Sequence, residues 1–367
     1  MLSALGTGSW FNDEGKLKRT GSPPLLEVQL MAVKLKRYTE LGERKIVKII
    51  QHHLDLMPKM PIPFGDDVSA YEIRNNEVAV LKTDMLVDKT DVPPGMSLRQ
   101  AARKAVVMNV SDFAAKGVKP SVALVALGLP RNLKQRDIEE LAEGLNAGAR
   151  EYDCYVVGGD TGEASDLIVS VSMFGLARKD ELVLRSGARP GDIVAVTGLF
   201  GKTSAGLKIL ANDFSVPLSL RGVLVRPVLT PQARLKEGLA LSRAHSVSAS
   251  MDSSDGLAWS LHELGRASKV GFLIDALPLA EEARRFAQLH GLDPVELALY
   301  GGEEYELVLT IRPERWNTAQ RAINEVGGVL LPIGKATEKE GFILSKEGKK
   351  CVIEARGYEH FRSDHFC

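Results

Sequence analysis

The sequence is poor in cysteine and carries no excess charge of either sign. Its three cysteines, Cys154, Cys351 and Cys367, form no C-x-x-C pair, which disfavours a disulfide scaffold and a structural zinc site. Lys plus Arg and Asp plus Glu each total 47 of the 367 residues, so no basic surplus exists to neutralise a nucleic-acid backbone. We therefore expect no nucleic-acid partner, and the low cysteine use favours the cytoplasm.

Long apolar runs are also missing. The most apolar stretch, residues 122–129, is bounded by Pro120 and Pro130 and falls well short of the roughly 18 apolar residues of a membrane helix. The N-terminus has no basic start followed by an apolar core, so a signal peptide is not expected, nor is membrane association. Residues 1–35 contain scattered Gly, Ser and Pro without a sustained period, which predicts a loosely ordered extension.

From residue 42 onward, helical and strand-like periods alternate. The pattern predicts helices at 43–54, 97–116 and 137–151, and strands at 78–86, 122–129 and 167–177. A polar turn cluster at 185–192 precedes strands at 193–197, 270–275 and 305–311 and helices from about 202 and at 231–243, 255–268, 281–290 and 313–326. We expect an α+β (α/β) protein with a domain at 36–180 and another at 181–367, each a mixed sheet with helices packed on one side.

Several well-known motifs are incomplete. Gly201-Lys-Thr resembles the end of a phosphate-binding P-loop, but Val196 stands where that loop needs glycine. Met251-Asp-Ser-Ser-Asp-Gly256 fails as an EF-hand, because Met251 and His262 occupy ligand positions. No H-E-x-x-H or G-x-S-x-G occurs, and the pair His52-His53 reads as a helix surface.

Short acidic clusters recur at strand ends and glycine turns. They are Gly65-Asp-Asp67, Thr83-Asp84, Ser111-Asp112, Gly158-Gly-Asp-Thr161, Asp252-Ser-Ser-Asp255 and Gly301-Gly-Glu-Glu304. Each alone is explained by turn chemistry, since Asp, Ser and Gly favour turns and caps. Asp112 differs, because it lies midway along an amphipathic helix and needs a partner there. Carboxylates and hydroxyls without His or Cys are ligands for Mg²⁺, so the clusters together favour a metal-dependent, phosphate-handling enzyme.

In their order along the chain, seven motifs resemble the thiamine-monophosphate kinase family, within the superfamily of aminoimidazole ribonucleotide synthetase. They are Gly65-Asp-Asp, Thr83-Asp-Met-Leu-Val87, Asn109-Val-Ser-Asp-Phe-Ala-Ala-Lys-Gly117 with Pro120, Gly158-Gly-Asp-Thr161, Arg185-Ser-Gly-Ala with Pro190-Gly-Asp192, Asp252-Ser-Ser-Asp-Gly256, and Gly301-Gly-Glu-Glu-Tyr-Glu-Leu307. The resemblance covers about residues 38–362. It implies a two-domain subunit whose N-terminal halves pair in a homodimer, with ATP and several Mg²⁺ ions near the subunit contact.

The implied reaction converts ATP and thiamine phosphate to ADP and thiamine diphosphate. The implied Mg²⁺ ligands are Asp66, Thr83, Asp84, Asp112, Asp160, Asp252 and Asp255. ATP would contact Gly159, Asp160, Arg185 and Ser254, and thiamine phosphate would contact Asp91, Glu303 and Tyr358. No general base is expected, because the attacking phosphate oxygen is already ionised at pH 7; positioning and charge neutralisation carry such a transfer.

The chain departs from the family pattern at three places. Thr90-Asp-Val-Pro93 replaces a His-Phe pair, Lys82 stands where a small residue is expected, and Glu304 replaces an Asp. Within the superfamily, the purine-pathway synthetase is the main alternative, because its acidic sites are alike. Selenophosphate synthetase needs an N-terminal Cys, and the hydrogenase-maturation dehydratase acts through a C-terminal Cys in a motif that the residues before Cys367 lack. A non-catalytic ATP-binding module is a further alternative.

Overall fold

The computed structural model describes residues 42–212, 214–346 and 348–361. The predicted extension at 1–35 lies outside them. The chain divides into two compact units, of which the smaller includes described residues 42–54 and 360–361 and the larger includes 55–359. In the smaller unit, helix α2 (Glu43–His52) confirms the predicted helix but ends two residues earlier, and His52 and His53 are exposed as expected.

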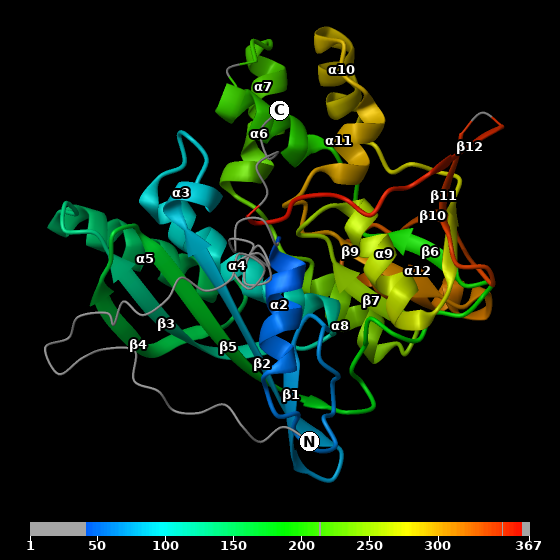
Figure 1. The fold of residues 1–367 in the computed structure, drawn as a ribbon, viewed down its shortest axis with the longest axis horizontal. Coiled ribbons are helices and arrows are strands. Elements are labelled where there is room, and N and C mark those ends of the chain that lie inside the picture. The colour runs from blue at the N-terminus through cyan, green and yellow to red at the C-terminus, as the bar shows by residue number, and fades with distance from the viewer. Residues whose placement is uncertain (1–41, 213, 347, 362–367) are drawn as a thin grey trace, which may run out of the picture. The chain divides into compact units, whose positions relative to one another are not determined.

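The N-terminal half forms a five-stranded sheet. Its strands are β1 (Ser69–Arg74), β2 (Glu77–Val87), β3 (Pro120–Leu129), β4 (Tyr155–Glu163) and β5 (Ile168–Arg178), in the order β1-β2-β5-β3-β4. Only the β3–β4 pair is parallel. Helices α4 (Leu98–Ala115) and α5 (Gln135–Glu151) pack together and against strands of this sheet (Figure 1). The short helix α3 (Asp88–Asp91) follows β2 directly.

Local sequence signals explain where α4 begins and ends. The hydroxyl of Ser97 accepts a hydrogen bond from the backbone of Gln100, whose side chain bonds back to Ser97, completing a capping box. Gly117, with φ 67°, adopts the left-handed conformation that ends the helix. These signals match the predicted helix at 97–116. The helical spacing predicts an inner face of Ala101, Ala105, Met108 and Phe113; Ala101, Ala105 and Phe113 are buried and Met108 is half-buried.

The C-terminal half forms a second mixed sheet. Its strands are β6 (Ile193–Val196), β7 (Ala249–Asp252), β8 (Gly271–Ile274), β9 (Leu307–Ile311), β10 (Leu331–Thr337), β11 (Phe342–Lys346) and β12 (Lys349–Val352), in the order β12-β11-β8-β10-β6-β9-β7. Its helices are α6 (Lys202–Asn212), α7 (Leu218–Leu229), α8 (Leu235–Arg243), α9 (Leu257–Ser268), α10 (Glu281–His290), α11 (Pro294–Tyr300) and α12 (Trp316–Glu325), the last preceded by the 3-10 helix η2 (Pro313–Arg315). The expected fold class, two mixed sheets with helices packed on them, is confirmed.

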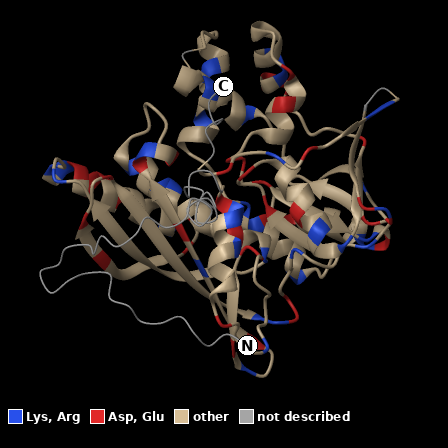
Figure 2. Cartoon of the chain, viewed as in Figure 1, with Lys and Arg blue, Asp and Glu red and all other residues tan. Residues whose placement is uncertain are grey.

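Helix α4 joins the two halves. It contacts β2 and β5 of the first sheet and also α8 and β7 of the second half. One apolar core includes Val110 and Phe113 of α4 together with Leu235 and Leu309 of the second half. Polar residues of α4 therefore lie where segments far apart in the sequence meet. Acidic and basic residues alternate over both halves (Figure 2), and no described helix has the length and apolarity needed to cross a membrane.

The first sheet has one face covered by helices and one open face. Along β2, Val78, Val80 and Leu86 are buried, whereas Leu81 and Met85 are 46% and 56% exposed. The strand registers place residues of neighbouring strands on the same open face. Its exposed large apolar side chains include Tyr71, Leu81, Met85, Leu124, Tyr155 and Leu176. Several exposed large apolar side chains on one face are typical of a surface that another chain covers.

Candidate active site

Three buried carboxylates meet where α4 contacts β7. Asp67 precedes β1, Asp112 lies on α4, and Asp252 ends β7. One oxygen from each lies within 4.8 Å of the other two, and the three residues are only 3%, 7% and 3% exposed. We call this group the acidic cluster. The hydroxyl of Ser111 donates to Asp252 over 2.7 Å and fixes that carboxylate.

Two basic side chains, Lys116 and Arg185, bind the carboxylates on one side of the acidic cluster. The ammonium of Lys116, fully buried, lies 2.6 Å from Asp66 and 2.7 Å from Asp67, and it donates to the carbonyl of Ser250 over 2.7 Å. Nε of Arg185 donates to Asp67 over 2.7 Å. These contacts make Asp67 an ion-paired residue that stays charged, since an isolated buried carboxylate is costly.

A third cation sits between the sheet and α4. The ammonium of Lys82 lies 3.0 Å from Asp84 on its own strand and 3.0 Å from Asp112. Lys82 is therefore the partner that Asp112 was expected to need at its position midway along the helix. Because β2 alternates, Lys82 and Asp84 share the helix-covered face, while Thr83 points to the open face.

The carboxylates of the acidic cluster differ in their pKa. Burial raises the pKa of Asp252 to about 6, and the charge of Asp67 adds to the rise. Burial also raises the pKa of Asp112, helped by Asp252 and opposed by Lys82. The pKa of Asp67 is lowered because Arg185 and Lys116 outweigh the effect of burial. Protein cations therefore do not fully offset the negative charge of Asp112 and Asp252. A bound metal cation would supply the missing positive charge.

A cavity of about 640 Å³ contains all three residues expected to contact thiamine phosphate. Asp91 comes from α3, Glu303 from the loop before β9, and Tyr358 from the C-terminal segment. Its remaining lining includes charged side chains and Tyr300; the charged ones are Lys89, Lys208, Glu296 and Arg356. The guanidinium of Arg356 stacks 3.5 Å from the centre of the Tyr300 ring.

The cavity and the acidic cluster are linked through backbone contacts. The loop after β7 follows Asp252 directly, and its Ser254 carbonyl accepts a hydrogen bond from the backbone N–H of Glu303 over 2.6 Å. The Asp255 carbonyl likewise accepts from the N–H of Tyr358 over 3.0 Å. The loop that follows Asp252 of the acidic cluster therefore also holds Glu303 and Tyr358 of the cavity, and Ser254 and Asp255 lie at the junction.

Not every expected residue is brought to this junction. Gly159 and Asp160 lie on β4, the far edge strand, and the register runs from Asp160 through Ala126 and Ser170 to Met85. Asp160 therefore lies on the open face, separated from β2 by two strands. Thr83 is on that face too, where its hydroxyl accepts a hydrogen bond from Ser172 over 3.0 Å. Within one chain, Thr83 and Asp160 do not join the acidic cluster.

Gly159 itself has a tight backbone environment. A side chain there would collide with strand β3, since a Cβ would lie 1.8 Å from the carbonyl oxygen of Val125. The glycines at 158, 159 and 162 also explain why β4 is hard to predict, because glycine is uncommon inside strands. From the sequence alone, these glycines predict a turn and not a strand.

Sequence reasoning missed several charged residues of this site. Only Asp66 of the pair Asp66-Asp67 was expected to act, and neither Lys104 on α4 nor Lys116 at its end was assigned a role. The helical period could have indicated which of the two lysines lies on the same side of the helix as Asp112. Lys116 follows Asp112 by four residues, about one helical turn, so the two lie on the same side of the helix, whereas Lys104 precedes Asp112 by eight residues and lies roughly 80° around it.

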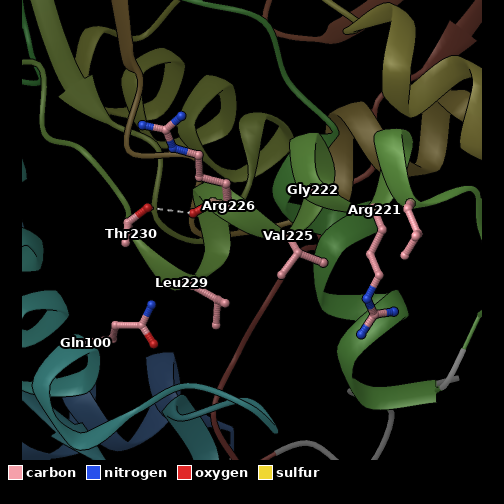
Figure 3. Close-up of a pocket in the computed structure, with 8 residues that line it drawn as sticks. Gln100, Arg221, Gly222, Val225, Arg226, Leu229 and Thr230 are labelled. Carbon is pink, nitrogen blue, oxygen red and sulfur yellow. Dashed lines mark hydrogen bonds between the residues drawn. The ribbon is translucent and has the colours of Figure 1, made fainter.

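A second hollow lies between α4 and α7 (Figure 3). About 430 Å³ in volume, it is lined by Gln100, Leu218, Arg221, Gly222, Val225, Arg226, Leu229 and Thr230. The side chains of Arg221 and Arg226 point away from each other, and the one hydrogen bond drawn joins the Thr230 hydroxyl to the Arg226 carbonyl, 2.9 Å. With no converging charges and none of the expected residues, this hollow is not our candidate site.

Comparison with known proteins defines the class. Residues 65–177 match the family model of the AIR synthase related protein, N-terminal domain, and residues 189–346 match that of the AIR synthase related protein, C-terminal domain. The chain thus has both domains of the AIR synthase related proteins.

Individual relatives narrow the class. Curated thiamine-monophosphate kinases of Nitrosopumilus maritimus and Pyrococcus horikoshii are 35% and 34% identical, each covering 88% of this chain, with 100% and 97% of the relative covered. The solved structure of AaThiL complexed with AMPPCP and TMP is 32% identical with a TM-score of 0.78, covering 89% of this chain and 99% of that one. The chain belongs to the thiamine-monophosphate kinase family, which confirms the resemblance found in its motifs.

Proposed function

We propose that this protein transfers the γ-phosphate of ATP to thiamine phosphate, forming ADP and thiamine diphosphate by direct in-line attack in the cytoplasm. The observation that carries the proposal is the acidic cluster joined by one loop to a cavity lined by Asp91, Glu303 and Tyr358. The relatives named thiamine-monophosphate kinase, and a structural neighbour complexed with AMPPCP and TMP, support it.

The acidic cluster fits Mg²⁺. Its donors are carboxylate oxygens within 4.8 Å of one another, with neither His nor Cys among them, which suits a hard cation. Asp67, Asp112 and Asp252 would hold the metal with Asp66, Asp84 and Asp255 close by in the sequence segments that form the cluster. Bound Mg²⁺ would neutralise the charge of the phosphate oxygens during transfer.

Protein groups would position the nucleotide. Arg185 is already placed at the cluster by Asp67, and its backbone N–H donates to Asp66 over 3.0 Å. A guanidinium is permanently charged and matches phosphate oxygens. We propose that Arg185 and Ser254 contact ATP, together with Gly159 and Asp160. No residue is assigned as a general base, because the attacking phosphate oxygen is already ionised.

The cavity would hold the organic part of thiamine phosphate. Asp91 and Glu303 give its wall negative charge, which favours the positive thiazolium ring. Tyr358 offers an aromatic ring and a hydroxyl beside them. Asp91, in place of the family's usual His-Phe pair, would thus attract the ring by charge.

A homodimer would cover the open sheet face. That face carries six exposed apolar side chains, and we propose that a second copy of the chain packs on it. Pairing would also explain Thr83 and Asp160, which cannot join the acidic cluster of their own chain. We propose that Asp160 serves the site of the partner subunit.

An ADP-release assay with Mg-ATP tests the activity. Thiamine phosphate, thiamine and formylglycinamidine ribonucleotide are compared as acceptors, and thiamine diphosphate is quantified in parallel. We expect ADP only with thiamine phosphate, in equal amount with thiamine diphosphate. ADP formed only with the ribonucleotide would instead indicate the purine-pathway synthetase, and ATP binding without turnover would indicate a non-catalytic module.

A further inference from the structure

Lys104 is a lysine with almost no exposure inside α4. It is 1% exposed, although a lysine ammonium is strongly hydrated and expensive to bury. Its ammonium donates to the carbonyl of Asp91 over 2.8 Å and to the carboxylate of Glu303 in a short ion pair. Both partners line the cavity proposed for thiamine phosphate. The buried ammonium is thus bound to two groups of the cavity lining.

The two partners come from segments far apart in the sequence. Asp91 ends α3, directly after β2, whereas Glu303 lies 199 residues from Lys104 in the sequence. Since one ammonium bonds to both, Lys104 links α3 to the loop that carries Glu303. Asp91 is itself tied to the sheet, because its carboxylate accepts a hydrogen bond from the N–H of Val87 over 2.7 Å.

Glu303 needs such support. Its backbone has φ 65°, the left-handed region that is strained for a non-glycine residue. Only one of its carboxylate oxygens is paired with Lys104. The other, Oε2, is buried and has no hydrogen-bond partner among the described residues. A buried carboxylate oxygen without a donor is unfavourable unless a ligand supplies one.

We propose that Lys104 is a positioning residue: it holds Glu303 so that the unpaired Oε2 is presented to a hydrogen-bond donor on the organic part of thiamine phosphate. The inference rests on the proposed function and adds to it a residue that touches neither substrate. The ion pair orients the carboxylate before the substrate arrives, which reduces the cost of ordering it on binding.

The alternative is that Lys104 merely stabilises the fold. The two roles differ in what they change. A positioning role affects the KM for thiamine phosphate and not that for ATP, whereas a structural role lowers the unfolding temperature and spares both constants. The test therefore needs steady-state kinetics for each substrate, thermal unfolding, and calorimetric binding of thiamine phosphate.

Lys104→Met keeps the length and volume of the side chain but removes its charge. We expect the KM for thiamine phosphate to rise about tenfold or more, the scale of a lost charged hydrogen bond, with the KM for ATP within twofold. Glu303→Gln should raise the same KM. Because the two residues act through one contact, adding Lys104→Met to Glu303→Gln should change it little further.

Arg103→Met is the matched control. Arg103 is the neighbouring residue of α4 and is also ion-paired, with Nε 3.0 Å from Glu151, but it does not line the cavity. We expect this variant to lose stability without a change in the KM for thiamine phosphate. If Lys104→Met does not fold, Lys104→Gln, which can still donate to the Asp91 carbonyl, is expected to fold and give the same kinetic effect.

Several outcomes would overturn the proposal. They are an unchanged KM for thiamine phosphate in a folded Lys104 variant, equal rises for both substrates, or effects of Lys104→Met and Glu303→Gln that multiply in the double variant. Failure of the proposed function looks different, because the wild-type protein itself would then neither turn over nor bind thiamine phosphate, and both proposals would fall together.

Discussion

Lys82 and Asp112 face each other across the contact between β2 and α4, with 3.0 Å between ammonium and carboxylate. Lys82 occupies a position where the family resemblance predicts a small residue, and it also pairs with Asp84. Its pKa is raised, because the two carboxylates outweigh the effect of burial. Without a bound metal, the ammonium of Lys82 offsets the repulsion between the carboxylates of Asp84 and Asp112.

Replacing Lys82 by Met should therefore destabilise the metal-free protein. Losing one partner of a buried ion pair costs on the order of 3 kcal/mol, which lowers the unfolding temperature by several degrees in a chain of this size. Added MgCl₂ should recover more stability in the variant than in the wild type, since Mg²⁺ would replace the missing charge. Thermal unfolding with EDTA and with MgCl₂ checks this. An equal response of the two proteins to Mg²⁺ would contradict it.

Asp112→Asn should separate stability from activity. Burial raises the pKa of Asp112, helped by the charge of Asp252, so a neutral amide relieves repulsion in the metal-free protein. Lys82 keeps its ion pair with Asp84 in this variant, so we expect an unfolding temperature in EDTA at or above that of the wild type. We expect kcat to fall by about 100-fold or more, since a metal ligand contributes several kcal/mol to the transition state. Asp153→Asn, on the exposed ion pair with Lys119, is the control and should change neither.

Glu304 should contribute a pH dependence to stability. Its carboxylate accepts hydrogen bonds from the backbone of Gly201 and Thr203 at the start of α6, but burial raises its pKa to about 7. The folded protein therefore holds this proton more tightly than the unfolded chain, so stability falls as pH rises from about 4.5 to 7, by at most about 1.4 kcal/mol per pH unit.

Glu304→Gln isolates this effect, because the amide keeps its volume and does not titrate. Urea unfolding of the wild type and the variant between pH 4.5 and 7.5 should show the difference in free energy growing in favour of the variant as pH rises. A difference that is constant across this range would show that Glu304 does not titrate there.

A charge on the open sheet face should prevent dimer formation. Leu81 is 46% exposed in the middle of this face, and an Asp there would have to be buried on pairing at high cost. Light scattering after gel filtration should find a dimer for the wild type and a monomer for Leu81→Asp. Leu218→Asp, at an 87% exposed leucine on α7, should stay dimeric; a dimeric Leu81→Asp would remove this face from the interface.

Mixed dimers can show which subunit uses Asp160. Asp84→Asn and Asp160→Asn should each remove most turnover as homodimers. If Asp160 serves the partner's site, co-expression yields mixed dimers with one intact site, and about a quarter of wild-type activity returns in a random mixture. If each site uses its own Asp160, both sites of the mixed dimer are defective and no activity returns.

Much of this molecule follows from its local sequence. The helical period, the Ser97 cap and Gly117 define α4, and the apolar runs define β2, β3 and β5 within a few residues. The acidic motifs and their order predicted the family, which the relatives confirm. These features are local because capping, turn formation and period need only neighbouring residues. Strand β4, rich in glycine, and helix α7, with Pro227 inside it, lack those signals and were missed.

The side-chain partners were decided by the tertiary structure. No pattern in the sequence pairs Lys104 with Glu303, 199 residues away, or brings Lys116 to Asp66 and Asp67. Strand alternation puts Thr83 and Asp84 on opposite faces, yet which face the helices cover depends on how α4 and α5 pack. Because a buried charge is tolerated only beside its partner, the sequence determined which residues are available for the site, and the packing of α4 between two sheets decided which of them meet.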